Sequence, residues 1–244
     1  MTRLVVILPK AVAMITPIAI SRTLPREMNS LNSLKNFFIF LTPKYVIYYI
    51  LHNYIVFYKM DWIMLASDVG FEDVRPLNME SLQVMPEVRD MCAADRCKVY
   101  GTRWACPPGC GSTDFCRERI RRYSSGILVQ TIGALEDGYD AEGISAAHRL
   151  HDRRFRLLAR QVRSVLPDCL PLSAGTCTNC EVCTYPGKPC RFPKKMLSSM
   201  EAYGLLVSDV CTKSGMPYYR GPKTITFTSC LLLEKSNSET ERIS

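Results

Sequence analysis

The chain of 244 residues lacks the motifs by which common enzymes are identified. It contains no GxSxG nucleophile turn, no Walker phosphate loop, no GxGxxG dinucleotide turn and no HExxH zinc motif. The C-x3-C-x2-C spacing of radical enzymes that use S-adenosylmethionine is also missing. These absences give no basis for assigning a catalytic activity. They leave the enzyme question open, because a cluster with an open iron can act as a Lewis acid.

Most of the chain carries almost no excess of positive charge. The formal net charge is +8, but residues 1–59 alone hold seven basic side chains and one acidic side chain. Residues 60–244 therefore carry 24 basic and 22 acidic side chains, a net charge of +2. This near-neutral balance does not predict a nucleic-acid surface.

Residues 1–59 have no glycine and no cysteine, and they are rich in Ile, Tyr, Phe and Asn. This composition resembles translated AT-rich upstream DNA, so we expect the true start at Met60 or Met64. Residues 37–58 are mostly apolar and long enough to span a bilayer. Lys44 interrupts this stretch, which weakens that reading. We therefore expect a membrane segment only if residues 1–59 are expressed.

Cysteine, by contrast, is abundant, with twelve residues. The run Cys177-Thr-Asn-Cys180-Glu-Val-Cys183 is followed by Cys190 beside a proline. Three cysteines at every third position can all face one central ion or cluster if the backbone curls around it. A C-x2-C-x2-C run with a fourth, more distant cysteine is the arrangement that holds a 4Fe–4S cluster. We predict that these four cysteines bind such a cluster.

A second group of five cysteines lies upstream, in a stretch rich in glycine and proline. Its backbone is expected to form tight turns whose amide N–H groups face cluster sulfurs. A 4Fe–4S cluster needs only four thiolates, so three are expected as ligands together with one of the two outer cysteines. The expected ligands are Cys97, Cys106 and Cys110, with Cys92 or Cys116 as the fourth.

Disulfides and zinc are the alternative explanations for these cysteines. A disulfide framework is typical of small proteins in oxidising compartments, which this long chain with ordinary apolar content does not resemble. Zinc is the stronger alternative, although zinc sites usually combine two CxxC pairs across a long spacer. We therefore favour a low-potential iron–sulfur cluster in the cytoplasm.

Helical and strand-like segments alternate after residue 60, which predicts an α/β or α+β fold. We expect a mixed sheet flanked by helices that carries two cysteine-rich metal-binding loops. The expected domain covers residues 60–233, and the polar tail 234–244 is expected to be disordered. Helices are expected at 61–69, at 80–91 with an interruption or a start near Pro86, and at 113–123, 141–166 and 194–203. Strands are expected at 126–132, 170–174, 205–210 and 224–233.

Four motifs together resemble one known family. They are Cys97-x2-Tyr-Gly-x2-Trp-x-Cys106-Pro-Pro, Ala174-Gly-x-Cys177-x2-Cys180-x2-Cys183, Pro189-Cys190-Arg-x-Pro193 and Ser199-Met-Glu-Ala-Tyr-Gly204. In this order, over roughly residues 60–233, the chain resembles the predicted metal-binding proteins of domain of unknown function 2284. The resemblance implies metal binding at six cysteines and places residues 1–59 outside the family. These six are Cys97, Cys106, Cys177, Cys180, Cys183 and Cys190.

Two histidines, His148 and His151, lie three residues apart on the expected long helix. This spacing can present two imidazoles to one metal. The flanking charged residues favour a solvated helix face instead. Three further cysteines have no partner at ligand spacing and are expected to be buried as small apolar side chains. These are Cys169, Cys211 and Cys230.

The sequence thus predicts a metal-binding protein with one or two 4Fe–4S clusters that passes electrons to a partner oxidoreductase. No nucleic-acid partner is expected. A zinc-stabilised protein-binding module is one alternative. A chaperone or sensor for a metal or cluster is the other.

Overall fold

The computed structural model describes residues 38–41, 45–50, 54–59 and 61–234. The chain divides into two units, Met1–Met60 and Asp61–Ser244. In the first unit, strands β1 (Phe38–Leu41), β2 (Tyr45–Ile50) and β3 (Tyr54–Lys59) pair in antiparallel order. None of the helices in the described ranges is long and apolar enough to cross a bilayer. The described parts of residues 37–58 are thus strands, and the expected tail lies outside the described residues after Glu234.

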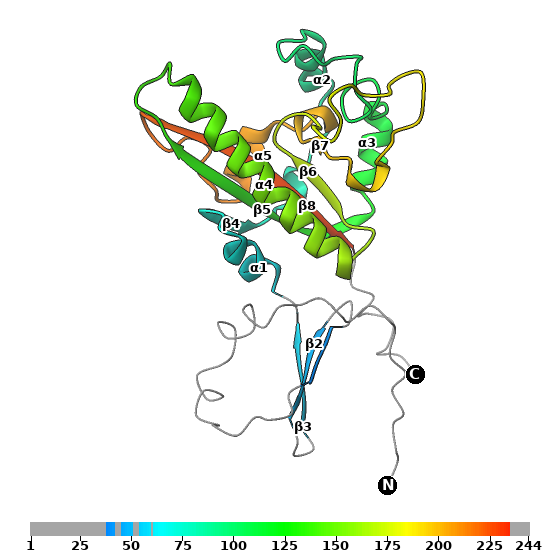
Figure 1. The fold of residues 1–244 in the computed structure, drawn as a ribbon, viewed down its shortest axis with the longest axis vertical. Coiled ribbons are helices and arrows are strands. Elements are labelled where there is room, and N and C mark those ends of the chain that lie inside the picture. Colours follow the sequence, from blue (N-terminus) through cyan, green and yellow to red (C-terminus); the bar gives the residue numbers. More distant parts are fainter. Residues whose placement is uncertain (1–37, 42–44, 51–53, 60, 235–244) are drawn as a thin grey trace. The chain divides into compact units, whose positions relative to one another are not determined.

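A mixed five-stranded sheet forms the centre of the second unit, as the sequence predicted (Figure 1). Its order is β4-β5-β8-β6-β7, and every neighbouring pair is antiparallel except β6 and β7. The long strands β5 and β8 pair from Ser125–Leu233 to Ala134–Thr224 and form the middle of the sheet. The strand bounds are β4 Asp73–Pro76, β5 Tyr123–Ala134, β6 Leu170–Ser173, β7 Ser198–Ser199 and β8 Thr224–Glu234.

Five α-helices and three short 3-10 turns are described in this unit. The helices are α1 Trp62–Val69, α2 Pro86–Ala93, α3 Thr113–Ile120, α4 Ala141–Val165 and α5 Val207–Lys213. The 3-10 turns are η3 Met79–Ser81, η4 Pro193–Lys195 and η5 Glu201–Tyr203.

Local side-chain chemistry sets several helix ends. The Asp61 carboxylate accepts hydrogen bonds from the backbone N–H groups of the first turn of α1, and Ser112 does the same for α3. Gly70 ends α1 with φ +103°, a left-handed conformation that glycine adopts without strain. The expected starts of these two helices, and the end of the first, are confirmed.

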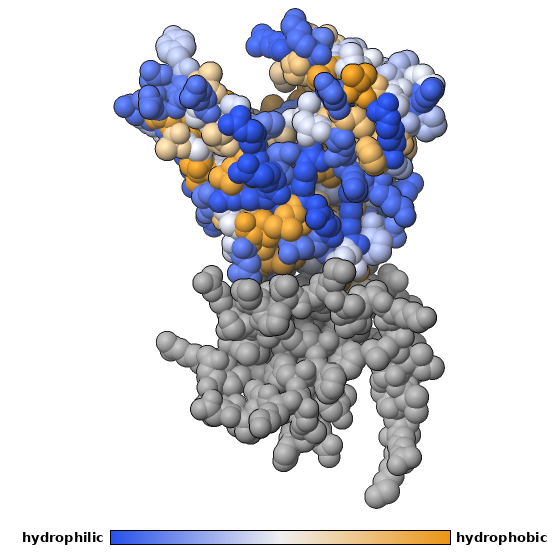
Figure 2. Space-filling model, in the orientation of Figure 1, coloured by the Kyte–Doolittle hydropathy of each residue, from blue (hydrophilic) through white to orange (hydrophobic). Residues whose placement is uncertain are grey.

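The two faces of the sheet are covered by different elements because side chains alternate along each strand. Ile127 and Val129 of β5 pack with Phe155 and Leu158 of α4, and α1 joins this cluster. Leu128 faces the opposite side, where η5 and α5 pack. Helix α4 therefore buries one apolar stripe, while Figure 2 shows mainly hydrophilic residues over its outer surface.

Two expected elements are wrong. Residues 194–203 do not form a helix, because Ser198–Ser199 pairs as β7 with Leu172–Ser173 and leaves only the turns η4 and η5 on either side. Residues 205–210 do not form a strand. They lead into α5, where Val207, Val210 and Cys211 are buried. In both places tertiary packing overrides a weak local preference.

Candidate metal centre

The two cysteine-rich stretches are irregular loops at the end of the second unit that carries α2 and α3 (Figure 1). We call residues 94–112, between α2 and α3, the upstream loop. Residues 174–192, between β6 and η4, form the downstream loop. Cys92 lies on α2 and Cys116 on α3, so regular elements flank the upstream loop with a cysteine on each side. All twelve cysteines lie in the described ranges and are unpaired, so the disulfide alternative has no support in this structure.

The loops are joined by Arg103 of the upstream loop. Its Nη1 donates hydrogen bonds to the backbone oxygens of Cys177, at 3.0 Å, and Cys180, at 3.4 Å. A single guanidinium therefore holds the first two cysteines of the C-x2-C-x2-C run by their main chain. The thiols of these residues stay available because the arginine binds only carbonyl groups.

Two further contacts join the loops. The Cys106 sulfur lies 3.1 Å from Thr176 Oγ1, and either atom can be the donor. Trp104 donates its indole N–H to the Lys188 carbonyl at 3.0 Å. The indole also packs edge-on against Tyr185, with ring centroids 4.9 Å apart. Trp104 of the upstream loop thus contacts the downstream loop at two residues.

Gly109 allows the close approach of the loops. A Cβ atom at this position would lie 2.6 Å from the Arg103 carbonyl oxygen and 3.0 Å from the Tyr185 ring. Only glycine fits here without a shift of the backbone that carries Arg103.

Cys183 has the surroundings of a stabilised thiolate. Burial by itself raises the pKa of its thiol, but backbone N–H groups of Trp104, Tyr185 and Thr184 outweigh this and lower the pKa below its usual value. The Arg103 guanidinium lowers the pKa further. Backbone N–H groups directed at sulfur are the donors that tune thiolate-bound metal centres.

A cavity of 340 Å³ opens beside Cys183. Its lining comes from both loops, so it exists only while they stay together. The lining residues are Gly101, Thr102, Arg103, Glu181, Val182, Cys183 and Tyr185.

Two further arginines hold the downstream loop, one from helix α4 and one from within the loop. Arg156 of α4 donates to Asn179 Oδ1 at 2.6 Å and to Thr178 Oγ1 at 2.9 Å. Arg191 donates to the Val182 carbonyl at 2.9 Å. The residues between the cysteines are therefore fixed by arginine side chains of α4 and of the loop itself, because the loop has no regular hydrogen-bond ladder.

The upstream cysteines fall into two sets of neighbours that meet at Cys106, since a charge on Cys106 also raises the pKa of Cys110. Cys92, Cys97 and Cys106 are close enough for a negative charge on one thiol to raise the pKa of another, and Cys106 has the same relation to Cys177. Burial is the main cause of the raised pKa of both Cys92 and Cys106. Cys106 is thus the upstream cysteine that connects to the downstream run.

Cys110 and Cys116 form the second group, around Arg89 of α2. Arg89 Nη1 lies 3.6 Å from the Cys110 sulfur and 3.7 Å from the Cys116 sulfur. The hydrogen bond between the two thiols raises the pKa of Cys110 and lowers that of Cys116 to about 7, and Arg89 also favours the Cys116 thiolate. Cys116 is completely buried, so it has no path to solvent in this structure.

The same Arg89 ties three elements together. It donates to the Ala202 carbonyl of η5 at 2.6 Å and to the Gly111 carbonyl at 2.7 Å. The Cys110 thiol also donates to the Ala202 carbonyl, at 3.4 Å. The Ser199–Gly204 motif noted in the sequence is thereby the turn against which α2 and the upstream loop pack.

The described residues contain no group of three or more His, Cys, Asp or Glu side chains placed to hold a metal ion. The four cysteines of the downstream run are half-buried and stand along the loop without converging. Their donor chemistry nevertheless suits iron or zinc, because thiolates are the preferred ligands of both. Cys169, Cys211 and Cys230 are buried away from these loops in the apolar clusters, as predicted.

The prediction that the two histidines lie on a solvated helix face is wrong for His151. Its ring is 1% exposed and lies between α4 and the sheet. The ring nitrogens contact Thr131 Oγ1 at 3.0 Å and Ser229 Oγ at 2.7 Å, which leaves neither nitrogen for a metal. Burial, followed by the nearby His148, lowers the pKa of His151 to about 3.

Sequence reasoning missed Arg89, Arg103 and Thr176, which hold the loops in place. Arg103 lies inside the Tyr-Gly-Thr-Arg-Trp motif, so its neighbours mark the position but not its role. The contact of Arg89 with Ala202 joins residues 113 positions apart, and no local spacing signals such a contact.

The comparison with curated proteins and the comparison with solved structures each found no match. The comparison with family models matched residues 75–233 to the predicted metal-binding proteins of domain of unknown function 2284. This range contains both loops and all twelve cysteines, and it covers about two thirds of the chain. The chain therefore belongs to this family of predicted metal-binding proteins.

Proposed function

We propose that the protein binds one or two 4Fe–4S clusters and passes single electrons to a partner oxidoreductase. The surroundings of Cys183 carry this proposal. Its thiol receives three backbone N–H groups and lies near a guanidinium, a combination that favours the deprotonated sulfur that iron requires. The N–H group of Trp104 comes from the upstream loop, and those of Thr184 and Tyr185 come from the downstream loop. The packing of the two loops therefore also favours the thiolate form of Cys183.

Cys177, Cys180, Cys183 and Cys190 would hold the first cluster, which would supply one-electron redox chemistry. Binding requires the downstream loop to close around the cluster, since its cysteines do not converge in the structure. Metal binding and local folding are commonly coupled in this way. Arg103 would hold the first part of the loop during closure through its two carbonyl contacts.

Cys97, Cys106 and Cys110 would contribute to a second cluster, with Cys92 or Cys116 as the fourth ligand. Arg89 would then donate to sulfur from the side and offset part of the negative charge of the thiolates. Separate Cys92→Ala and Cys116→Ala variants distinguish the two choices, because only loss of the true ligand lowers the iron content.

Metal and sulfide analysis of the full chain purified without oxygen tests the proposal. We expect brown protein with a broad visible absorbance and about eight irons per chain if both clusters form. Cys183→Ala should remove much of this absorbance. Cys169→Ala is the matched control because this buried cysteine lies in the apolar core, and its absorbance should equal that of the parent. Colourless protein with stoichiometric zinc would refute the proposal and favour the zinc-stabilised module.

A further inference from the structure

Positive charge is concentrated around the candidate centre. Residues 92–111 and 174–197 together hold seven basic and two acidic side chains, a net charge of +5. The other residues between 61 and 234 hold 15 basic and 18 acidic side chains, a net charge of −3. The near-neutral total of the second unit therefore hides a separation of charge between the loops and the remaining surface.

Six of these seven basic side chains are exposed, and we call them the cationic rim. Two of its members lie near Cys183, because Arg191 binds the Val182 carbonyl and the Lys188 carbonyl accepts from Trp104. The members of the rim are Arg96, Lys98, Lys188, Arg191, Lys194 and Lys195.

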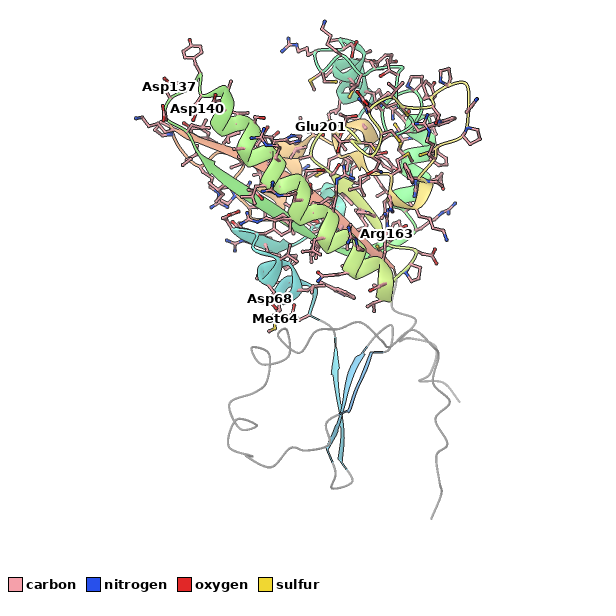
Figure 3. All side chains as sticks on the ribbon, in the orientation of Figure 1. Met64, Asp68, Asp137, Asp140, Arg163 and Glu201 are labelled. Atoms are coloured by element: carbon pink, nitrogen blue, oxygen red, sulfur yellow. The ribbon has the colours of Figure 1, made fainter. Side chains whose placement is uncertain are left out.

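Acidic residues gather elsewhere. Figure 3 shows Asp137 and Asp140 at the opposite end of α4 from Arg163, whose guanidinium donates to the Lys194 carbonyl at 2.6 Å. Of the two acids within residues 92–111 and 174–197, Asp95 is held by the backbone N–H groups of Val99 and Tyr100. Helix α4 therefore has acidic residues at its N-terminal end, whereas Lys194 of the rim lies beside its C-terminal end.

Exposed apolar side chains lie among the cations. Val182 is 72% exposed, Met91 60% and Phe192 42%. Figure 2 shows hydrophobic residues beside hydrophilic ones at the end of the unit that carries α2 and the cysteine loops. Apolar side chains bordered by charge are typical of protein interfaces, whereas a nucleic-acid site depends mainly on phosphate contacts by cations. The mixture favours a protein partner.

We propose that the cationic rim is the docking surface for an acidic electron-carrier protein. Its acidic face would meet the rim, and its redox group would come to rest near the exposed side of Cys183. One electron would pass from the reduced carrier to the oxidised cluster, with no bond made or broken. This exchange rests on the proposed function, while the docking surface itself rests on charge and exposure alone.

Charge reversal in the rim tests the surface. The rim variant carries Lys188→Glu, Lys194→Glu and Lys195→Glu, three sites whose contacts with Trp104, Arg163 and Asn179 use only their carbonyl groups. The control variant carries Arg149→Glu, Arg153→Glu and Lys213→Glu, which are exposed and lie on α4 and α5. Both variants change the net charge equally, so a difference in their binding depends on where the substituted residues lie.

The probe is a purified acidic flavodoxin, whose binding to the full chain as purified is measured at low and high salt. At low salt we expect the rim variant to bind at least about tenfold more weakly than the parent, with little change in the control variant and a smaller difference at high salt. Equal weakening in both variants, or no binding by the parent, would overturn the proposal. Binding of a single-stranded oligonucleotide by the rim, without binding of flavodoxin, would also overturn it.

Metal analysis of the same samples separates this proposal from the proposed function. Loss of flavodoxin binding in the rim variant of a zinc-containing, colourless protein supports the docking surface and refutes the cluster. If the parent is brown, and the parent, rim variant and control variant all accept electrons from reduced flavodoxin equally fast, the cluster is supported and the docking surface is overturned.

Discussion

Replacement of Arg103 by methionine tests whether the interlocked loops prepare the metal site. Methionine keeps the length and the apolar stem of the side chain and removes the guanidinium. The carbonyls of Cys177 and Cys180 then lose their donor from the upstream loop. The Cys183 thiolate also loses a nearby positive charge, while its backbone N–H donors stay in place.

The structure gives the size of the expected effect. A hydrogen bond from a charged donor contributes about 1.5–3 kcal/mol, and the 3.4 Å contact with Cys180 is much weaker than the 3.0 Å contact with Cys177. Because Arg103 is only half-buried, solvent reduces this to about 1–2 kcal/mol. About 1.4 kcal/mol corresponds to a tenfold change in an equilibrium constant, so we expect roughly tenfold weaker metal retention.

Competition with a chelator under anoxic conditions measures this retention. Arg103→Lys should give an intermediate result because it keeps the charge but has a single donor group. Arg121→Met is the matched control, since Arg121 pairs with Glu118 on the exposed surface of α3. If Arg103→Met retained metal as tightly as Arg121→Met, the argument that this arginine prepares the site would be refuted.

Three further changes probe the framework. Arg89→Met should lower the free energy of unfolding in urea by about 3 kcal/mol, because two inward-facing carbonyls lose their donor, and Arg89→Lys should recover part of it. Gly109→Ala should lower the free energy of unfolding by about 1–3 kcal/mol, because the new methyl group forces the Arg103 backbone away. The control Gly138→Ala has open space around it and should leave the free energy of unfolding nearly unchanged. His151 has a folded-state pKa of about 3, below its unfolded value of 6.5, so its contribution to stability is complete above pH 6.5 and is lost as the pH falls toward 3. His151→Gln should flatten unfolding free energy against pH over this window, and an unchanged slope would contradict the assignment.

The sheet and most helices were predictable because their signals are local. A continuous apolar run marks β5, alternation of Thr with Ile and Phe marks β8, and Asp61 and Ser112 mark the starts of α1 and α3. The burial of His151 was not predictable from its charged neighbours. The hydroxyl groups that hydrogen-bond its ring belong to Thr131 of β5 and Ser229 of β8, far from it in the sequence. A polar residue on an apolar helix face is thus recognised only once its distant partners are known.

The cysteines of the candidate centre were predictable from spacing, but their grouping was not. Spacing alone treated Cys92 and Cys116 as equal candidates. The structure sets Cys116 beside Cys110 and Arg89, and it sets Cys92 near Cys97 and Cys106. This grouping depends on how α2 and α3 pack against η5, which no pattern within either loop encodes.

The dependence of the downstream loop on borrowed guanidinium groups has a consequence for sequence change. Its shape depends on Arg103, which binds only main-chain carbonyls, and on Arg156, which binds the side chains of Thr178 and Asn179. Thr178 and Asn179 are therefore constrained together with these arginines, although neither residue is a metal ligand. Transfer of the cysteine run alone to another scaffold would therefore carry over the candidate ligands without the arginines that hold the loop in place.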